Sequence, residues 1–246
     1  MRIKKGILIL PVFLLQIKYA NVKINYMKNK IHKIIILGPQ GSGKGTQAEF
    51  LSKKLIVPNI SIGQLLRNEI ENKTEIGKQA KEFMNKGQLV PNSIAHKLAK
   101  NRIKKDDCKN GFIFDGFPRI IIQAKFIETV TNISSVILVN ISDDEAIYRL
   151  SGRRTCTKCG EIYHIKFNPP KTENICDKCG GKLEIREDDT EDSIRKRLKI
   201  YHTETEEVVE YYRDKNLLIE INGEQSIEKV KRDIFSSLGL KNWKIK

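Results

Sequence analysis

The sequence predicts an α/β fold with a parallel five-stranded sheet that carries helices on both faces. Short apolar runs rich in β-branched residues alternate with longer, partly polar segments that are typical of helices. The first apolar run, residues 34–37, leads directly into a glycine-rich loop. The 246 residues also have an ordinary composition, with 39% hydrophobic and 30% charged residues, which excludes a collagen, a coiled coil and a wholly disordered chain.

The strands and helices follow one another in a regular order. Strands are predicted at residues 32–37, 57–60, 112–114, 135–141 and 217–221, where short apolar runs end at polar or turn-forming residues. Helices are predicted at residues 44–55, 61–73, 74–86, 91–105, 143–153, 190–215 and 226–238, and in a segment ending at about residue 130. Ser61 is a suitable N-cap, Gly87 a helix stop and Pro91 a typical first-turn residue.

Two segments do not fit the alternation of strand and helix. Residues 61–90 (the helical segment) contain helices alone, and residues 152–189 (the cysteine segment) contain Gly, Pro and short β-like pieces. We interpret both as small domains inserted over the carboxyl edge of the sheet. The core is then built from residues 31–60, 91–151 and 190–246, and residues 1–30 form an N-terminal extension.

The net charge of +15 suggests an anionic partner, with nucleic acid as the first candidate. However, residues 1–33 contain eight Lys or Arg and no Asp or Glu, which leaves +7 for the rest of the chain. Aromatic residues are not interleaved with the basic ones. We therefore expect no nucleic-acid partner, and a basic zinc-ribbon protein that binds nucleic acid is kept as the alternative class.

The N-terminal extension is basic, then apolar, then basic again. Its apolar run, residues 6–15, is too short to cross a bilayer as a helix, and no membrane partner is expected. The pattern is typical of a signal peptide or an organellar presequence, or it precedes a true start at Met27. We expect a cytoplasmic protein, or an organellar one if residues 1–26 act as a targeting segment.

Four of the five cysteines form two Cys-x-x-Cys-Gly pairs, Cys156 with Cys159 and Cys176 with Cys179, and sixteen residues separate the pairs. This spacing predicts a tetrahedral Zn²⁺ site with four thiolate ligands, which is structural because no coordination position stays open. Two disulfides are the alternative if the protein is exported. Cys108 stands apart and is predicted to be a small core residue.

The glycine-rich loop, residues 38–46, lies between the first strand and the first helix. In that context it predicts a phosphate-binding loop (P-loop), because its backbone N–H groups and the helix N-terminus converge on phosphate oxygens. Lys44 can reach the β- and γ-phosphates, and the Thr46 hydroxyl can serve Mg²⁺. Asp115 follows a buried strand, where its carboxylate can orient Mg²⁺ and its waters; capping a helix is its alternative role.

Further motifs follow the loop, in which GSGKGTQ occupies residues 41–47. They are SIGQLLR (61–67), GQLV (87–90), DGFPR (115–119) with Gln123, RLSGRR (149–154), IYH (162–164), FNPP (167–170), REDD (186–189) and RKR (195–197). Together they resemble the adenylate kinase family of nucleoside monophosphate kinases, in its form with a long zinc-bearing lid. The resemblance implies a P-loop NTPase-type core, with the helical segment as the NMP-binding insert and the cysteine segment as a zinc-stabilised lid.

The resemblance also implies a function: reversible, Mg²⁺-dependent phosphoryl transfer, ATP + AMP = 2 ADP, by a phosphotransferase that we expect to be a monomer. ATP and AMP are its partners, and Mg²⁺ with ATP and a structural Zn²⁺ are its cofactors. At residue 62 the family usually has Thr, and Ile62 therefore keeps open another nucleoside monophosphate kinase, such as a GTP:AMP enzyme. Residue 64, commonly Asp, is Gln.

The site residues also follow from the resemblance. Catalytic roles fall to Lys44, Asp115, Arg119, Arg153, Arg186 and Arg197. ATP would bind at Gly41, Ser42, Gly43, Lys44, Gly45, Thr46, Arg149, Arg153, Ile162, Tyr163 and Gln225. AMP would bind at Ile62, Arg67, Gln88, Leu89, Val90, Gly116, Phe117, Pro118, Arg119, Gln123, Arg186 and Arg197, with Gln123 against the adenine. Asp188 and Asp189 would form the lid hinge.

Overall fold

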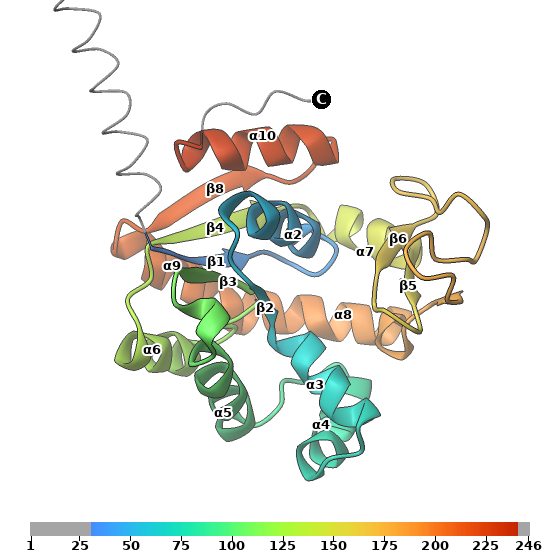
Figure 1. Cartoon of the computed structure of the whole chain (residues 1–246), viewed down its shortest axis with the longest axis horizontal. Helices are drawn as coiled ribbons and strands as arrows, with labels where there is room; N and C mark the ends of the chain where they lie inside the picture. The colour runs from blue at the N-terminus through green and yellow to red at the C-terminus, as the bar shows by residue number, and fades with distance from the viewer. Residues whose placement is uncertain (1–30, 241–246) are drawn as a thin grey trace, which may run out of the picture. The chain divides into compact units, whose positions relative to one another are not determined.

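A computed structural model describes residues 31–240, and the predicted N-terminal extension lies outside the described residues. The described residues are built around a sheet of five parallel strands in the order β2-β3-β1-β4-β8, which confirms the predicted sheet (Figure 1). The strands are β1 (His32–Leu37), β2 (Asn59–Ser61), β3 (Gly111–Asp115), β4 (Ser135–Asn140) and β8 (Leu218–Asn222). The register pairs Ile36 with Asp115, so the carboxyl ends of β1 and β3 meet at one edge.

Helices cover both faces of this sheet because its strands are apolar on both sides. In β1, Ile34 and Ile36 belong to one hydrophobic cluster, whereas Ile35 and Leu37 belong to the other. The first cluster lies under α2 (Lys44–Leu55) and α10 (Ile227–Ser237), and the second under α5 (Asn92–Ile103), α6 (Ile121–Val130) and α9 (Glu206–Asp214). Figure 1 shows these two helical layers above and below the sheet.

The helical segment forms two packed helices, α3 (Ile62–Glu71) and α4 (Glu75–Asn85). Each begins at a hydroxyl N-cap: Ser61 accepts from the backbone N–H of Gln64, and Thr74 accepts from that of Gly77. A Cβ atom on Gly77 would lie 2.1 Å from the carbonyl oxygen of Glu69, so the helices can approach this closely only with glycine there.

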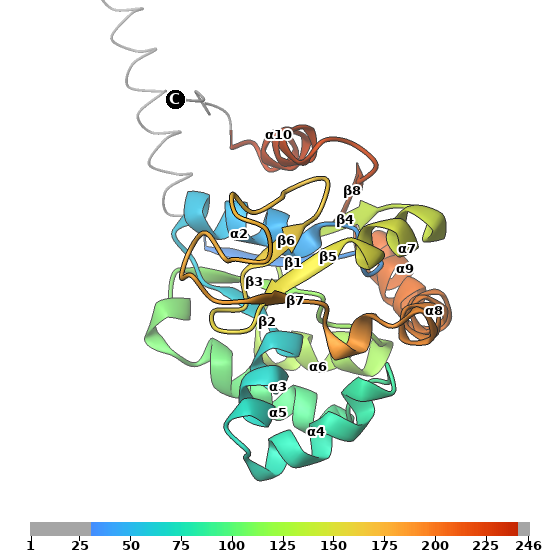
Figure 2. The same ribbon diagram turned by 90° about the vertical axis from the view of Figure 1, so that its right-hand side faces the viewer.

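The cysteine segment carries a separate three-stranded antiparallel sheet. It consists of β5 (Arg153–Cys156), β6 (Ile162–His164) and β7 (Leu183–Glu184), with β5 in the middle. In Figure 2 this small sheet lies in front of the carboxyl end of the large one. The prediction that the preceding helix includes Arg153 is wrong: α7 (Asp143–Ser151) ends before Gly152, and Arg153 begins β5 because its backbone pairs with His164.

The predicted helix over residues 190–215 is present as an unbroken helical run with a π-helical turn inside it. It comprises α8 (Glu191–Ile200), a π-helical turn (Tyr201–Thr205) and α9. Such a turn widens a helix locally and is frequent at functional sites. Two short 3₁₀ turns, Asp106–Cys108 and Glu187–Asp189, complete the secondary structure of the described residues. Among residues 31–240, no helix is both long enough and apolar enough to cross a membrane.

Candidate active site and metal centre

The loop between β1 and α2 is shaped for close approach of its backbone to an anion. Gly38, Gly41 and Gly43 all have positive φ angles, and a Cβ atom on Gly38 would lie 2.2 Å from the carbonyl oxygen of Val139. The first turn of α2 contains no acidic residue, which leaves the positive end of the helix uncompensated. These features are those of a phosphate-binding loop.

Lys44 begins α2 and folds back across this loop. Its Nζ donates to the carbonyl oxygen of Pro39 at 3.0 Å. Burial lowers the pKa of Lys44 to about 8, and the positive charges of Arg119, Arg153 and Arg197 act in the same direction against Asp115. A buried, under-compensated ammonium of this kind is stabilised by a polyanionic ligand.

Asp115 ends β3 opposite the same loop. A Cβ atom on Gly45 would lie 3.2 Å from Asp115 Oδ2, so the carboxylate contacts the start of α2. Among the described residues, Asp115 Oδ1 is buried without a hydrogen-bond partner. Burial raises the pKa of Asp115, although Lys44 and Arg119 oppose the shift. A hard, unpartnered carboxylate oxygen beside a phosphate loop fits the ligand preference of Mg²⁺ and its waters.

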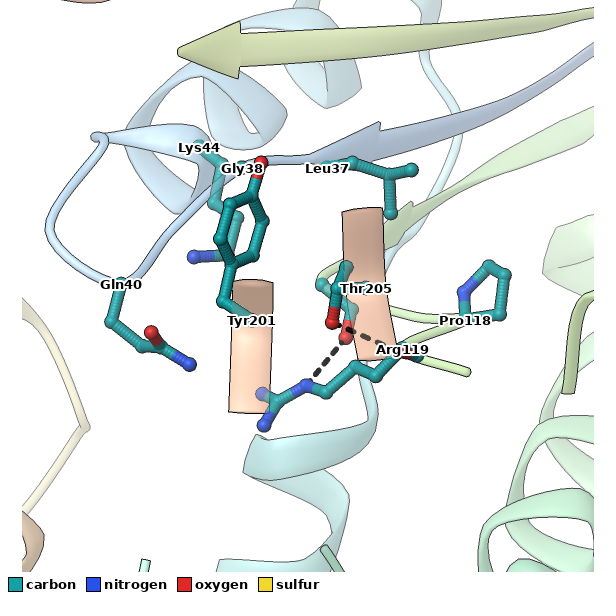
Figure 3. Close-up of a pocket in the computed structure, with 9 residues that line it drawn as sticks. Leu37, Gly38, Gln40, Lys44, Pro118, Arg119, Tyr201 and Thr205 are labelled. Atoms are coloured by element: carbon teal, nitrogen blue, oxygen red, sulfur yellow. Dashed lines mark hydrogen bonds between the residues drawn. The ribbon is translucent and has the colours of Figure 1, made fainter. Parts of the chain in front are cut away.

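Arg119 follows β3 and is held at three points. Its Nε donates to the carbonyl oxygen of Gly116 at 2.9 Å, its backbone N–H donates to Gln123 Oε1 at 2.9 Å, and its own carbonyl oxygen accepts from Thr205 Oγ1 at 2.8 Å. Figure 3 shows Lys44, Arg119 and Thr205 around a small cavity that Tyr201 also lines. Burial lowers the pKa of Arg119, and Arg197 lowers it further.

Arg67 reaches the site from α3. Its Nε and Nη2 both donate to Gln64 Oε1, at 3.1 and 3.0 Å, so the neutral amide holds the guanidinium without cancelling its charge. Burial lowers the pKa of Arg67, while the carboxylate of Asp188 opposes this shift.

Three more arginines surround the hinge carboxylates of the cysteine segment. Arg153 forms a two-pronged ion pair with Asp189, and Arg197 contacts Asp189 at 2.8 Å and Asp188 at 3.1 Å. Burial alone would raise the pKa of Asp189, but the charges of Arg153 and Arg197 outweigh it and lower the pKa. Arg186 donates to Thr155 Oγ1 at 2.9 Å, and burial lowers its pKa to about 9.

The cluster as a whole has an excess of positive charge. Its charged side chains come from distant parts of the chain, yet they lie close enough for the charge of one to shift the pKa of another. The six cations are Lys44, Arg67, Arg119, Arg153, Arg186 and Arg197, and the three carboxylates are Asp115, Asp188 and Asp189. Such an excess, inside a partly desolvated cleft, favours a ligand with several negative charges.

The remaining residues predicted for AMP lie between the helical segment and α6. Gln123 is 3% exposed, and Phe117 and Ile62 are buried in the hydrophobic cluster that joins the helical segment to the sheet. The connection from α4 to α5 contains Gln88, Leu89 and Val90. At its start, the backbone N–H of Gln88 donates to the Phe83 carbonyl oxygen near the end of α4.

The residues predicted for the ATP base are distributed over α7, β6 and the end of β8. Arg149 donates to the Gly223 carbonyl oxygen at 3.0 Å, and Gln225 is bonded to Asn222 and Asp233. Ile162 is exposed, whereas the Tyr163 side chain is buried with the cysteines, and its hydroxyl accepts from the Asp177 N–H at 2.8 Å. The expectation that the Tyr163 ring covers the ATP base is therefore wrong, because this ring packs into the cysteine cluster and leaves only its backbone for a nucleotide.

An aromatic side chain of the FNPP motif, to which the sequence assigned no ligand contact, lies next to Arg149. The Arg149 guanidinium carbon is 5.7 Å from the ring centroid of Phe167, which also packs against His164 and Tyr148. Phe167 is still 44% exposed. An exposed ring beside a guanidinium is suited to stacking on a base. The sequence signal for it was the short FNPP motif after β6.

The four paired cysteines converge on one point. Their sulfur atoms all lie within 4.8 Å of one another, and the shortest contacts join the two pairs, with Cys156 to Cys179 at 3.5 Å and Cys159 to Cys176 at 3.6 Å. A tetrahedral metal with Zn–S bonds of about 2.3 Å requires sulfur separations of about 3.8 Å, which this cluster matches, whereas a disulfide requires about 2.05 Å. The predicted disulfide alternative is therefore not observed.

The two cysteine turns have the same local geometry. The N–H of Gly160 donates to the Cys156 carbonyl oxygen at 3.0 Å and that of Gly180 donates to the Cys176 carbonyl oxygen at 2.8 Å, and both glycines have positive φ. The first turn faces the helical segment closely, since a Cβ atom added to Gly160 would lie 3.7 Å from Gln64 Nε2. The cysteine cluster is thus built into the segment that faces α3.

Comparison with known proteins identifies the family. The adenylate kinase family profile matches residues 36–217. The chain is 46% identical over 213 residues to adenylate kinase of Caldicellulosiruptor saccharolyticus, covering 85% of this chain and 99% of the relative. It is 45% identical to the adenylate kinases of Methanocella arvoryzae, over 84% of this chain and 98% of the relative, and Clostridium tetani, over 85% and 99%. The chain belongs to the adenylate kinase family.

Proposed function

We propose that this chain catalyses the reversible transfer of the γ-phosphoryl group of ATP to AMP, giving two ADP. The observation that carries the proposal is the convergence of six cations on one partly buried site at the carboxyl edge of the sheet, next to a phosphate loop. Phosphoryl transfer needs positioning and charge stabilisation more than a covalent nucleophile, and this site supplies both.

ATP would occupy the phosphate loop and extend toward the cysteine segment. The loop backbone and Lys44 would hold its phosphates, and Arg149 with the backbone around Ile162 and Tyr163 would cover its base. Two features support this placement: the first turn of α2 has no acidic residue, and burial lowers the pKa of Lys44. A bound anion would stabilise both the positive end of the helix and the charged form of Lys44. The ATP contacts proposed are Gly41, Ser42, Gly43, Lys44, Gly45, Thr46, Arg149, Arg153, Ile162, Tyr163 and Gln225.

AMP would bind between the helical segment and α6. Arg67 and Arg119 would hold its phosphate, with Arg186 and Arg197 completing the cluster around the transferred group, and Gln123 would contact its base. Arginine is suited to these positions because its planar fork can donate two parallel hydrogen bonds to a phosphate. The remaining AMP contacts proposed are Ile62, Gln88, Leu89, Val90, Gly116, Phe117 and Pro118.

The metals fit the residues that would hold them. Asp115, with the Thr46 hydroxyl, would help hold Mg²⁺ bound to ATP, which supplies neutralisation of phosphate charge. Cys156, Cys159, Cys176 and Cys179 would hold a structural Zn²⁺, which supplies rigidity to a segment without a large core.

The two inserted segments would exclude water from the reaction. With both nucleotides bound, they close over the site, so that the acceptor phosphate of AMP rather than water meets the γ-phosphoryl group. The approach of Gly160 to Gln64, where an added Cβ atom would lie 3.7 Å from the amide nitrogen, and the ion pairs of Asp188 and Asp189 support a closed arrangement of this kind. In it, Arg153 and Arg197 would contact the transferred group while Asp188 and Asp189 hold their guanidinium groups.

The experiment that tests this proposal measures acceptor and donor choice. Purified protein is assayed for nucleoside diphosphate formation with AMP, CMP, UMP and GMP, each with ATP and with GTP. We expect the highest kcat/KM for ATP with AMP. A higher kcat/KM with another acceptor, or with GTP as the donor, would replace the proposal by a different nucleoside monophosphate kinase, for which the apolar Ile62 provides the structural reason.

The nucleic-acid alternative is tested separately. Deleting residues 1–26 removes most of the acid-free basic segment, and DNA binding is then measured as a function of salt. We expect weak, strongly salt-dependent binding that is lost with the deletion, and persistent tight binding would favour the alternative. The proposed cytoplasmic location is tested by the N-terminus of the protein isolated from its own cell, and the proposed monomer by its mass in solution.

A further inference from the structure

Two buried amide side chains are hydrogen-bonded where the helical segment joins the core. Gln123 is the third residue of α6, and Asn92 is the first residue of α5. Gln123 Nε2 donates to Asn92 Oδ1 at 3.0 Å, and Gln123 Oε1 accepts from the backbone N–H of Arg119 at 2.9 Å. Gln123 is 3% exposed and Asn92 is half-buried, so neither amide can exchange these bonds freely for bonds to water.

These two bonds settle the orientation of the Gln123 amide. A backbone N–H can only donate, so the atom that faces Arg119 must be the oxygen. The nitrogen then faces Asn92, which must present its own oxygen. Each end of the Gln123 amide keeps one unused position: a lone pair on Oε1 and an N–H on Nε2.

We propose that Asn92 is a positioning residue that holds the plane of the Gln123 amide, whose polarity the Arg119 N–H sets, and thereby makes the acceptor site select a 6-aminopurine over a 6-oxopurine. The inference rests on the proposed function, in which Gln123 faces the base of AMP. The free lone pair complements the 6-amino group of adenine, and the free N–H complements its ring N1. Hypoxanthine has the same shape but the reverse pattern, with an oxygen at position 6 and a hydrogen on N1.

Asn92 contributes to this selection by holding the nitrogen end of the Gln123 amide. The bond from Arg119 fixes one end of the Gln123 amide, but that end alone leaves the plane free to turn. The bond to Asn92 fixes the other end. In a base held in one orientation by its phosphate, IMP would place oxygen against Oε1 and N–H against Nε2. Two acceptors that face each other, or two donors, cannot form a hydrogen bond, so these buried polar groups stay unpaired and the affinity for IMP is lowered.

The test compares variants of Asn92 with AMP and IMP as acceptors at saturating ATP. In Asn92→Leu, which removes the acceptor at similar size, we expect the KM for AMP to rise about threefold to tenfold and kcat to stay within twofold. The ratio of kcat/KM for AMP to that for IMP should fall by a similar factor. Asn92→Asp keeps an acceptor oxygen and should restore both the KM and the ratio.

The control is Asn101→Leu, on the exposed side of the same helix, which should leave both values unchanged. Thermal melting checks that each variant is folded, and Asn92→Ala replaces the leucine variant if that one is not. The inference is overturned if the AMP-to-IMP ratio stays within twofold of the parent value, if both acceptors weaken equally, or if aspartate fails to restore selection. Failure of the proposed function is distinct, since the parent protein would then not phosphorylate AMP.

Discussion

The sheet core and the cysteine segment are held together by different physics. The core buries uninterrupted apolar strands, with Ile34, Ile35, Ile36 and Ile113 fully inaccessible to solvent. The 38 residues of the cysteine segment have one small buried cluster, which consists of Cys156, Tyr163, Cys176 and Leu183. A segment this small cannot gain enough from hydrophobic burial to order its backbone. We expect its order to come from the cysteine site, whereas the order of the P-loop comes from the core beneath it.

If the core rather than the cysteine segment carries the chemistry, removing the Lys44 ammonium should have the largest effect on activity. We expect Lys44→Met to lower kcat/KM for ADP formation by at least about 10²–10³-fold, because a preorganised charge on the phosphates is lost. The melting temperature should not fall, because the buried ammonium is already disfavoured by its surroundings. Lys53→Met, at an exposed position of α2, is the matched control. A variant that keeps a tenth of the parent activity would contradict the role of Lys44.

The two regions meet at Asp189, which is inaccessible to solvent and neutralises Arg153 and Arg197. Asp189→Asn leaves two partly buried guanidinium groups under-compensated, and we expect it to lower the free energy of unfolding by about 3–5 kcal/mol. Urea denaturation measures the change, with the exposed Asp214→Asn as control. An unchanged midpoint would show that the ion pairs do not join the regions.

The next test separates the metal from the chemistry. Cys176→Ser should abolish stoichiometric zinc binding and lower the melting temperature strongly, but it should lower turnover at low temperature much less if the proposed zinc is structural. Cys108→Ala, which alters the buried cysteine outside the cluster, is the control. Equal losses of turnover and stability in a variant that is still folded at the assay temperature would indicate a catalytic metal instead.

A smaller effect is expected where α7 meets the π-helical turn. His202 contacts Asp143 at 2.9 Å and Glu206 at 2.7 Å, and these hydrogen bonds raise the pKa of its imidazole. A group whose pKa is raised on folding stabilises the protein fully below its unfolded pKa of about 6.5, and this stability is lost as the pH rises through the folded value. We expect His202→Gln to cost less than about 1 kcal/mol at pH 5.5 and less still at pH 9. A larger cost at pH 9 than at pH 5.5 would contradict the assigned pairs.

Much of the molecule could be predicted from its sequence because the signals are local. The apolar run before Gly38, the loop glycines and the paired cysteines each specify their surroundings within a few residues. The ion pair of Arg153 with Asp189 spans 36 residues, and the bond of Gln123 to Asn92 spans 31. Such partners are chosen by the tertiary fold. The π-helical turn was missed because residues 201–205 have an ordinary helical pattern, whereas Thr205 in this turn donates to the Arg119 carbonyl oxygen, 86 residues away in the chain.

The most direct test of the contrast between the two regions is hydrogen exchange measured on the zinc-loaded protein before and after chelation. Amides of residues 152–189 should lose their protection when the metal is removed, while those of β1, β3 and β4 should keep theirs. That result would show that the metal organises the cysteine segment and the apolar sheet organises the P-loop. Protection lost equally in both regions, or in neither, would contradict the account.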